Sequence, residues 1–291
     1  MNWPKELKVR VNHPLKDKNT FRVGGSAQFF SEPIDAAELS LLIKLAGKNK
    51  IPAYTLGAGS NLLISDKGVK GLVLRLNSPY FKNISREKEF IRAGSGVMLG
   101  ELIRFAKSKS LQGAEFLTGI PGTLGGALAM NAGCWGRSIG DLVVDAQVMS
   151  KRGEIKTLSR KEIEFSYRKS SLSGYIILSA LLKLKKGSAA EIKKNINRFL
   201  ASRRKTQDLT SPNAGCIFKN PKNNSAGMLI DLCGLKGKHA GGAFISERHA
   251  NFILNKNKAS AADVLGLMRM VKQRVKDKFG LILQPEIEVW R

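Results

Sequence analysis

The spacing of hydrophobic and polar residues predicts both helices and strands in this chain. A helix is expected to begin after Asp35, because Glu38 follows this N-cap candidate by three positions and apolar residues then recur at helical spacing. The sequence Lys50-Ile51-Pro52 is expected to end this helix. Further amphipathic helices are expected from residue 99 to Gly113, after Gly187 in a basic segment, and from Ser260 to Gly280.

Short apolar runs bounded by glycine, proline or polar residues predict strands. They cover residues 53–56, 71–76, 90–93, 143–149, 176–184 and 281–290. In the last run Glu286 and Glu288 share one face, because side chains alternate along a strand. Residues 119–136 are rich in glycine and other small residues, so we expect loop and tightly packed backbone there rather than regular helix. The mixture excludes an all-α or all-β fold.

The charge of the chain is strongly positive. Lysine and arginine together number 49 against 23 aspartates and glutamates, which gives a formal net charge of +26. This charge raises the alternative of a nucleic-acid-binding protein, but the lysines are scattered and no long basic run is interleaved with aromatic residues. We therefore favour a solvated basic surface that attracts anionic small molecules. In the helix after Gly187, the side chains expected to face water are Lys193, Lys194, Arg203 and Arg204.

The cysteines and histidines suggest no disulfide or metal framework. Cys134, Cys216 and Cys233 lack paired spacing, and the three histidines make no metal-ligand spacing with them. The first residues lack the apolar core of a signal peptide, and no run of about 18 apolar residues occurs, as a membrane span would need. We therefore expect a cytoplasmic protein without a metal or a membrane partner. Its 291 residues, of which 43% are hydrophobic, suffice for two domains or three small ones.

Two glycine-rich loops are candidates for binding a phosphate group. The first, Gly57-Ala58-Gly59-Ser60-Asn61-Leu62, matches only half of a dinucleotide fingerprint, because Leu62 occupies the third glycine position. The second, Gly119-Ile120-Pro121-Gly122-Thr123-Leu124-Gly125-Gly126, leads into Ala129-Met130-Asn131-Ala132-Gly133. Small residues let backbone amides converge on an anion, so the two loops together suit a pyrophosphate and a planar cofactor. An ordinary tight turn is the alternative for either loop alone.

These loops belong to an ordered series of motifs that resembles one enzyme family. The other members are Thr20-Phe21-Arg22-Val23-Gly24-Gly25, Tyr167-Arg168-Lys169-Ser170, Ala214-Gly215-Cys216-Ile217-Phe218-Lys219-Asn220-Pro221, Ser246-Glu247-Arg248-His249-Ala250-Asn251-Phe252 and Gln284-Pro285-Glu286. Each motif alone is weak, but the ordered set is specific. It resembles the UDP-N-acetylenolpyruvoylglucosamine reductases from about Asn19 to Val289.

The resemblance implies an α+β fold with an FAD-binding region of the vanillyl-alcohol-oxidase (PCMH) type. An N-terminal segment would cover residues 1–18, and the FAD-binding region would cover 19–186, with subdomains of about 19–66 and 67–186. A C-terminal α+β substrate domain would cover residues 187–291. The short stretch between Arg168 and Ile176 resembles the compact variety, which lacks an inserted tyrosine loop. The expected oligomeric state is a monomer.

The resemblance also implies the reaction and the cofactor. In this family NADPH reduces FAD, which then reduces UDP-N-acetylglucosamine enolpyruvate to UDP-N-acetylmuramate for bacterial peptidoglycan precursor synthesis. The cofactor-binding residues that it implies are Tyr54, Gly57, Ala58, Gly59, Ser60, Asn61, Leu62, Gly119, Ile120, Pro121, Gly122, Thr123, Gly125, Gly126, Asn131, Ala132 and Gly133. An alternative is another FAD-dependent oxidoreductase on the same scaffold.

The reaction requires stabilisation of a developing negative charge and delivery of a proton. Arg168 is the candidate that holds the substrate carboxylate with its fork of donors, although an arginine can also serve a surface ion pair. Glu286, if buried and protonated, could donate a hydrogen bond to the enolate, whereas the alternative is a strand glutamate facing water. Gln284 stands where the family commonly has another glutamate, so no second carboxylate is expected beside Glu286.

Cys216 is the candidate proton donor at a position where the family usually carries serine. A free thiol titrates near pH 8.5 and is therefore a much stronger acid than a hydroxyl. Lys219 lies three residues on and could lower the thiol pKa, which would oppose donation. The alternative for Cys216 is a buried small hydrophobe, the role expected of the other two cysteines. Tyr167, Lys219 and Asn220 are the substrate-binding residues that the resemblance implies.

Overall fold

The computed structural model describes residues 3–291, which divide into two compact units. The first unit comprises the chain up to Val11, Phe29–Ala58 and Gly71–Arg203. The second comprises Asn12–Gln28, Gly59–Lys70 and Arg204–Arg291. Each unit is therefore assembled from separate stretches of sequence. The predicted domain boundaries at residues 18/19 and 186/187 stay predictions.

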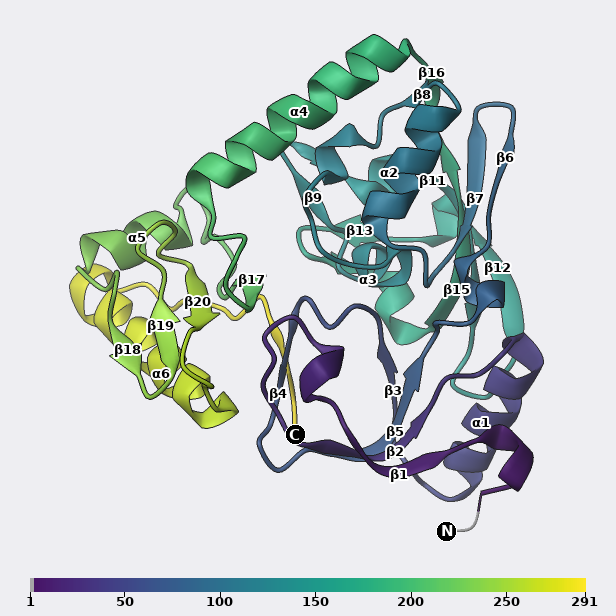
Figure 1. Cartoon of the computed structure of the whole chain (residues 1–291), viewed down its shortest axis with the longest axis horizontal. Helices are drawn as coiled ribbons and strands as arrows, with labels where there is room; N and C mark the ends of the chain where they lie inside the picture. The colour runs from purple at the N-terminus through teal and green to yellow at the C-terminus, as the bar shows by residue number, and fades with distance from the viewer. Residues whose placement is uncertain (1–2) are drawn as a thin grey trace. The chain divides into compact units, whose positions relative to one another are not determined.

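The first unit is built on a five-stranded antiparallel sheet with the order β12-β11-β15-β7-β6 (Figure 1). Its strands are β6 (Ile84–Glu87), β7 (Phe90–Gly94), β11 (Val143–Met149), β12 (Ile155–Ser159) and β15 (Ile176–Lys183). Another sheet has the order β1-β2-β5-β3, and its strands are β1 (Arg10–Pro14), β2 (Ser26–Ser31), β5 (Val69–Arg75) and β3 (Ala53–Leu56). The pairing of β3 with β5 is parallel.

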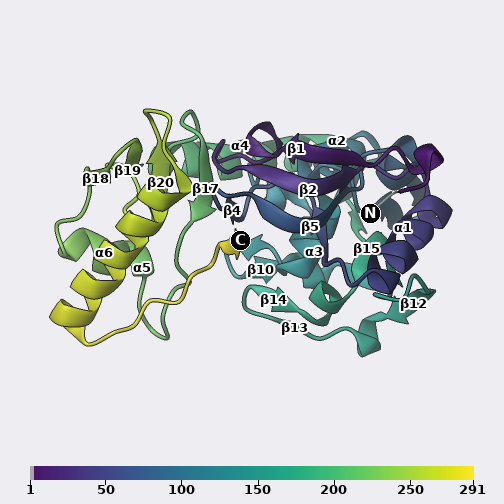
Figure 2. The same cartoon turned by 90° about the horizontal axis from the view of Figure 1, so that it is seen from below.

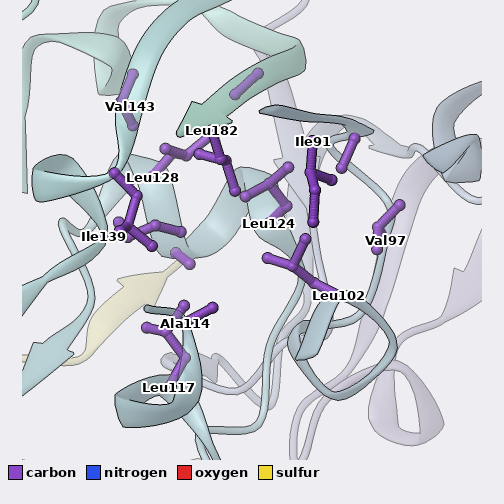
Figure 3. Close-up of a cluster of buried hydrophobic side chains, with 14 of the residues drawn as sticks. Ile91, Val97, Leu102, Ala114, Leu117, Leu124, Leu128, Ile139, Val143 and Leu182 are labelled. Atoms are coloured by element: carbon purple, nitrogen blue, oxygen red, sulfur yellow. The ribbon is translucent and has the colours of Figure 1, made fainter. Parts of the chain in front are cut away.

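Three helices contribute buried residues to the hydrophobic clusters of the first unit. They are α1 (Ala36–Lys48), α2 (Leu99–Ser108) and α3 (Leu124–Ala129). Helices α2 and α3 share one hydrophobic cluster with the sheet, in which Leu102, Leu124 and Leu182 are buried (Figure 3). Helix α1 belongs to a separate cluster with Leu39, Leu42 and other buried residues. The central strands β11 and β15 are accordingly mostly buried, whereas the edge strands β6 and β12 are mostly exposed.

Short elements complete the first unit. They are β8 (Leu111–Gln112) paired with β16 (Lys185–Lys186), β9 (Gly133–Cys134) paired with β10 (Arg137–Ser138), and β13 (Phe165–Ser166) paired with β14 (Lys169–Ser170). Helix α4 (Ala189–Thr206) contributes its residues up to Arg203 to this unit. Its Ile192 is buried in the first turn, as the amphipathic pattern predicted.

The second unit combines a four-stranded sheet with two helices (Figure 2). The sheet has the order β17-β20-β19-β18, and its strands are β17 (Asn213–Cys216), β18 (His239–Ala240), β19 (Ala243–Ile245) and β20 (Phe252–Asn255). The helices are α5 (Ala226–Leu232) and α6 (Ala261–Phe279). The two remaining strands, β4 (Leu62–Ile64) and β21 (Glu288–Trp290), pair in parallel.

Several predicted elements are confirmed together with their capping residues. Asp35 caps α1, because its carboxylate accepts a hydrogen bond of 2.9 Å from the Glu38 backbone N–H. Ser260 caps α6 in the same way, and Gly280 ends α6 in the left-handed conformation with φ of 70°. The strands predicted at residues 53–56 and 143–149 have the observed bounds.

Three expectations about the backbone are wrong. The helix predicted to reach Gly113 ends at Ser108, because residues 111–112 pair as β8 with β16. The segment expected to be free of helix contains α3, whose N-cap Thr123 accepts a hydrogen bond from the Gly126 N–H. The many glycines made this segment resemble a loop, but Leu124 and Leu128 stand four residues apart and form the buried apolar face of a helix.

The third wrong expectation concerns the C-terminal strand, which covers residues 288–290 rather than 281–290. The backbone of residues 284–286, which precede this strand, forms hydrogen bonds with the segment that follows β17 and does not extend the pairing with β4. The Lys219 N–H donates to the Gln284 carbonyl at 2.9 Å, and the Glu286 N–H donates to the Ile217 carbonyl at 2.8 Å. This irregular pairing places Glu286 beside the segment that carries Cys216.

Candidate active site

The two glycine-rich loops meet within the first unit. A Cβ atom added to Gly57 would lie 2.7 Å from the Oγ1 atom of Thr123, so no larger side chain fits without displacing the second loop. Gly119 has φ of 77°, a conformation that favours glycine. A Cβ on Gly125 would lie 2.9 Å from the Cβ of Ser95. The two loops thus pack so closely that larger side chains are disfavoured at these positions, and their roles in binding a cofactor stay predictions.

The remaining residues of the first loop belong to the second unit. Gly59 has φ of 64°, and a Cβ atom there would lie 2.6 Å from the Cα of Asn19. Its carbonyl accepts a hydrogen bond of 3.2 Å from the Thr20 N–H, and Leu62 then opens strand β4. Tyr54 lies on β3 in the first unit, half-buried. These positions leave the predicted roles of the first loop and of Tyr54 in cofactor binding as predictions.

Asn131 fastens the end of the second loop to a hairpin. This residue adopts φ of 43° and is buried, and its Nδ2 atom donates to the Ser166 carbonyl at 3.0 Å. Its Oδ1 atom accepts from the Gly140 N–H at 3.1 Å. The Ser170 hydroxyl donates to the Leu128 carbonyl at 2.7 Å. These contacts hold the hairpin β13–β14 against α3 from both of its strands.

Arg168 lies at the turn of this hairpin. It adopts the left-handed conformation, with φ of 56°. Its Nη1 atom donates to the Gly133 carbonyl at 3.1 Å, and its guanidinium lies 5.1 Å from the centre of the Tyr167 ring. Tyr167 itself is 54% exposed. The structure therefore brings Arg168 to the loop motif that ends at Gly133, although these residues are far apart in sequence.

Cys216 ends strand β17 in the second unit and is half-buried. It pairs with Phe252 across the sheet, and the register shifts between Asn213 and Cys216. Gly215 has φ of 73° within this irregularity. The Glu286 N–H bonds to the carbonyl of the residue after Cys216, as described above, so the predicted proton donor and the predicted acid lie on neighbouring segments.

Asn61 holds the backbone on both sides of Ile287. Its Nδ2 atom donates to the Glu286 carbonyl at 3.1 Å, and its own carbonyl accepts from the Glu288 N–H at 3.0 Å. Glu286 is half-buried, whereas Glu288 is exposed. Asn61 was predicted to bind the cofactor, and its side chain in this structure also fixes the segment that carries Glu286.

Lys219 and Asn220 follow the Cys216 segment. Lys219 is half-buried and Asn220 is exposed. The Oδ1 atom of Asn220 accepts a hydrogen bond of 3.0 Å from the Ala226 N–H, at the start of α5. Asn220 therefore helps to fix the N-terminal end of α5, whatever it contributes to substrate binding.

Arg203 was expected to face water, and that expectation is wrong. Its Nε atom donates to the Thr118 carbonyl at 2.8 Å, and its Nη2 atom donates to the Cys134 sulfur at 3.3 Å. The guanidinium also lies 5.1 Å from the centre of the Trp135 ring. Residue 203 stands four positions after Phe199 on α4, so this helical spacing was the signal that it shares the packed face.

Cys134 and Cys233 pack against the two main hydrophobic clusters, as predicted. Burial raises the pKa of the Cys134 thiol above its ordinary value, although the Arg203 guanidinium opposes this shift. The thiol donates a hydrogen bond of 2.8 Å to the Phe116 carbonyl. Within residues 3–291, no group of three or more His, Cys, Asp or Glu residues could hold a metal ion. None of the helices in this range is long and apolar enough to cross a membrane.

Comparison with known proteins defines the class first. Residues 27–159 match the model of an FAD binding domain. A glucose dehydrogenase structure aligns over 64% of this chain and 43% of its own with a TM-score of 0.51 and 14% identity, which is a likeness in fold alone. The fold is α+β, with an FAD-binding region of the vanillyl-alcohol-oxidase (PCMH) type and a C-terminal α+β domain. The chain is an FAD-dependent oxidoreductase.

The relatives then define the family. Residues 207–290 match the UDP-N-acetylenolpyruvoylglucosamine reductase C-terminal domain. UDP-N-acetylenolpyruvoylglucosamine reductase 2 of Symbiobacterium thermophilum is 42% identical over 97% of this chain and 92% of its own, and a reductase of Caldanaerobacter subterraneus is 41% identical over 98% and 94%. The crystal structure of the Thermus caldophilus enzyme aligns over 97% of this chain and 100% of its own, with 36% identity and a TM-score of 0.84. This chain belongs to the UDP-N-acetylenolpyruvoylglucosamine reductase family.

Proposed function

We propose that this chain reduces UDP-N-acetylglucosamine enolpyruvate to UDP-N-acetylmuramate at the expense of NADPH, in peptidoglycan precursor synthesis. The names of its relatives support this reaction. The observation that carries the proposal is the hydrogen bond of 2.8 Å between the Glu286 N–H and the Ile217 carbonyl. It joins the segment of a candidate acid to the segment of Cys216, and this reduction needs an acid and a proton donor.

The glycine-rich loops suit FAD, because glycine at residue 57 lets the first loop approach Thr123 closely and leaves backbone amides unshielded by side chains. When bound, this cofactor supplies the hydride that adds to the terminal carbon of the enolpyruvyl double bond. The residues that we propose to hold it are the members of the two loops other than Leu124, together with Tyr54, Asn131, Ala132 and Gly133. The glycines among them let the backbone approach the phosphates closely.

Arg168 binds the substrate carboxylate in this proposal. Once a hydride has reached the terminal carbon, negative charge on the neighbouring carbon spreads into the carboxylate. A guanidinium stays charged throughout and can donate two parallel hydrogen bonds, so it stabilises this charge without a change of protonation. Tyr167 beside it, Lys219 and Asn220 are the proposed contacts of the rest of the substrate, with Lys219 suited to a diphosphate.

Cys216 and Glu286 complete the reduction. The Cys216 thiol transfers its proton to the carbon next to the carboxylate, the S–H bond breaks as the C–H bond forms, and solvent restores the thiol. In this proposal Glu286 acts as a carboxylic acid that donates a hydrogen bond to the enolate before that transfer. The hydride and the proton together account for the two hydrogen atoms added to the double bond.

The decisive experiment is anaerobic stopped-flow spectroscopy of the purified holoenzyme. We expect NADPH to bleach the flavin absorbance and UDP-N-acetylglucosamine enolpyruvate to restore it. Reoxidation by a simple alcohol-derived ketone or by dioxygen, but not by the UDP-sugar, would instead indicate another oxidoreductase on this scaffold. Salt-sensitive DNA binding by a protein that holds no flavin would support the nucleic-acid alternative.

A further inference from the structure

Asn251 lies at the end of the motif Ser246-Glu247-Arg248-His249-Ala250-Asn251-Phe252, for which the proposed reaction provides no role. It is buried, with 2% of its surface exposed. Its Oδ1 atom accepts a hydrogen bond of 2.9 Å from the Phe218 N–H, and its Nδ2 atom donates to the Phe218 carbonyl at 2.7 Å. One carboxamide thus satisfies both backbone groups of one residue, as a neighbouring strand would do.

In the segment that follows β17, the Asn251 carboxamide replaces the hydrogen bonds that a neighbouring strand would provide. The ladder between β17 and β20 has a register shift before Cys216, and Cys216 is its last paired residue. Beyond it, the Ile217 N–H donates to the Asn251 carbonyl at 2.9 Å. The Phe218 side chain is 1% exposed, so its peptide groups cannot turn to water without leaving the core. Asn251 therefore fixes the backbone immediately after Cys216.

The same short segment also sets the place of Glu286. The Ile217 carbonyl accepts the hydrogen bond from the Glu286 N–H, and residue 218 forms an antiparallel bridge with Pro285. A displacement of the Phe218 peptide would therefore move Cys216 and Glu286 relative to each other. Proton transfer is sensitive to such displacements, because about 1 Å of misplacement can lower a rate about 10²-fold.

We propose that Asn251 is a positioning residue for the proton-transfer step: its carboxamide fixes the Phe218 peptide and thereby holds Cys216 where it can protonate the substrate carbon. This inference rests on the proposed function. It assigns Asn251 to the second half of the reaction and leaves flavin reduction by NADPH independent of this residue.

The first test compares Asn251→Leu with Asn255→Leu. Asn255 is a matched control, because it lies on β20, is 9% exposed, and uses its carboxamide to accept from the Ala259 N–H at 2.8 Å and to donate to the Phe21 carbonyl at 3.0 Å. We expect Asn251→Leu to slow flavin reoxidation by the substrate about 10²-fold, with flavin reduction changed less than about twofold. Asn255→Leu should lower the melting temperature and leave both rate constants near those of the wild type.

The second test uses Asn251→Asp as a conservative variant. A protonated carboxyl group both donates and accepts, so it can replace the carboxamide, whereas the ionised form opposes the Phe218 carbonyl with a second acceptor. The ratio of the variant's reoxidation rate constant to that of the wild type should lie near one at acidic pH and fall as pH rises. A merely structural role would change both half-reactions alike, whereas here the rate constant of flavin reduction should not follow this pH dependence.

The outcomes separate the inference from the function on which it rests. Wild-type enzyme that the UDP-sugar cannot reoxidise would reject the proposed function itself. With a working wild type, equal loss in both half-reactions for Asn251→Leu would overturn the inference, as would a loss no larger than that of Asn255→Leu. A full additional loss from Asn251→Leu in a Cys216→Ala background would also overturn it, because the two residues would then act independently. Should Asn251→Leu not fold, a pH-independent ratio for Asn251→Asp would overturn it.

Discussion

Arg168 in the first unit and Cys216 in the second are held in place by different means. Arg168 lies at the turn of a hairpin beside an exposed tyrosine, and the hairpin is tied to the end of α3 by polar side chains on its flanks. Cys216 lies at the end of a strand whose continuation is enclosed by buried groups, among them Asn251. The comparison teaches that substitution of Arg168 can change chemistry with little effect on the fold. Substitutions around Cys216 affect both.

In both units, however, asparagine side chains form the hydrogen bonds that hold the segments carrying the candidate residues. Asn131 joins the second loop to the hairpin, Asn61 holds the Glu286 segment, and Asn251 holds the peptide after Cys216. In each case a carboxamide bonds to backbone groups, so the partner residue can vary without loss of the contact. Arg168 and Cys216 are both half-buried, so the two units differ in the burial of the groups around them and not in that of the candidate side chains.

The largest effect in the first unit is expected at Arg168. Arg168→Ala should slow flavin reoxidation by the substrate about 10³-fold, because the charge on the substrate carboxylate loses its donors. Arg168→Lys keeps the charge without the fork and should recover part of the rate. The melting temperature of both variants should stay near that of the wild type. Anaerobic stopped-flow and thermal unfolding check these expectations together.

Arg160→Ala is the matched control in the same unit. Arg160 also donates to a backbone carbonyl, that of Ile163 at 2.8 Å, and its guanidinium lies 5.0 Å from the centre of the Phe165 ring. Its loss should leave both half-reactions unchanged. A similar drop for Arg160→Ala would mean that general loss of positive charge, rather than a contact from Arg168, causes the effect.

A smaller effect, on flavin content, is expected from a substitution that crowds the contact between the two glycine-rich loops. In Gly57→Ala the added methyl group would lie 2.7 Å from the Thr123 Oγ1 atom, which also caps α3. Overpacking of this kind costs about 1–3 kcal/mol, and we expect purified variant to carry less flavin per chain. The absorbance ratio of flavin to protein measures this directly.

Gly47→Ala provides the contrast, because no atom lies within 4 Å of a Cβ placed there and the residue is inside α1. This change should stabilise the protein by up to about 1 kcal/mol and leave flavin content unchanged. Full flavin content in Gly57→Ala would show that the close approach of the loops does not matter for the cofactor.

The smallest expected effect is a dependence of the unfolding free energy on pH, caused by His249 in the second unit. Burial lowers the pKa of His249 below its ordinary value of 6.5, and nearby Lys236 acts in the same direction. The folded state therefore favours neutral imidazole, whose Nδ1 atom accepts a hydrogen bond of 3.3 Å from the Asn251 N–H. As pH falls, His249 takes up a proton in the unfolded chain at a higher pH than in the folded protein. The stability that neutral His249 contributes is therefore lost as pH falls from 6.5 towards the lower pKa of the folded state.

We expect the change in unfolding free energy from this group to be below about 1 kcal/mol, since the ring is only half-buried. Urea unfolding of the wild type and of His249→Gln at neutral and mildly acidic pH would measure it. The difference in unfolding free energy between the two proteins should shrink as the pH falls. A difference that stays constant with pH would contradict the assignment to His249.

Local signals in the sequence predicted much of the fold. The capping of α1 by Asp35 and of α6 by Ser260 follows from residues within one helical turn, and so it was recovered. Helix α3 was missed because glycine has low helix propensity, while burial of Leu124 and Leu128 supplies the stability that propensity lacks. The last strand was overextended because nothing local shows that the backbone of Gln284 bonds elsewhere.

The candidate site shows the same limit. Cys216, Arg168 and Glu286 were singled out by motif resemblance, and their roles stay predictions. The contacts of Asn251 could not be predicted from the sequence, because they depend on which backbone groups a strand irregularity leaves for a side chain to satisfy. Arg203 could have been assigned to the packed face of α4 from its spacing alone.

The most direct measurement compares the two half-reactions of Cys216→Ala and Cys216→Ser with those of the wild type. NADPH should bleach the flavin at wild-type rates in all three proteins, because Cys216 takes no part in that step. Reoxidation by UDP-N-acetylglucosamine enolpyruvate should be about 10²–10⁴-fold slower in Cys216→Ala and largely retained in Cys216→Ser, which carries the residue usual in the family. Reoxidation of Cys216→Ala at the wild-type rate would contradict the proposal that Cys216 is the proton donor.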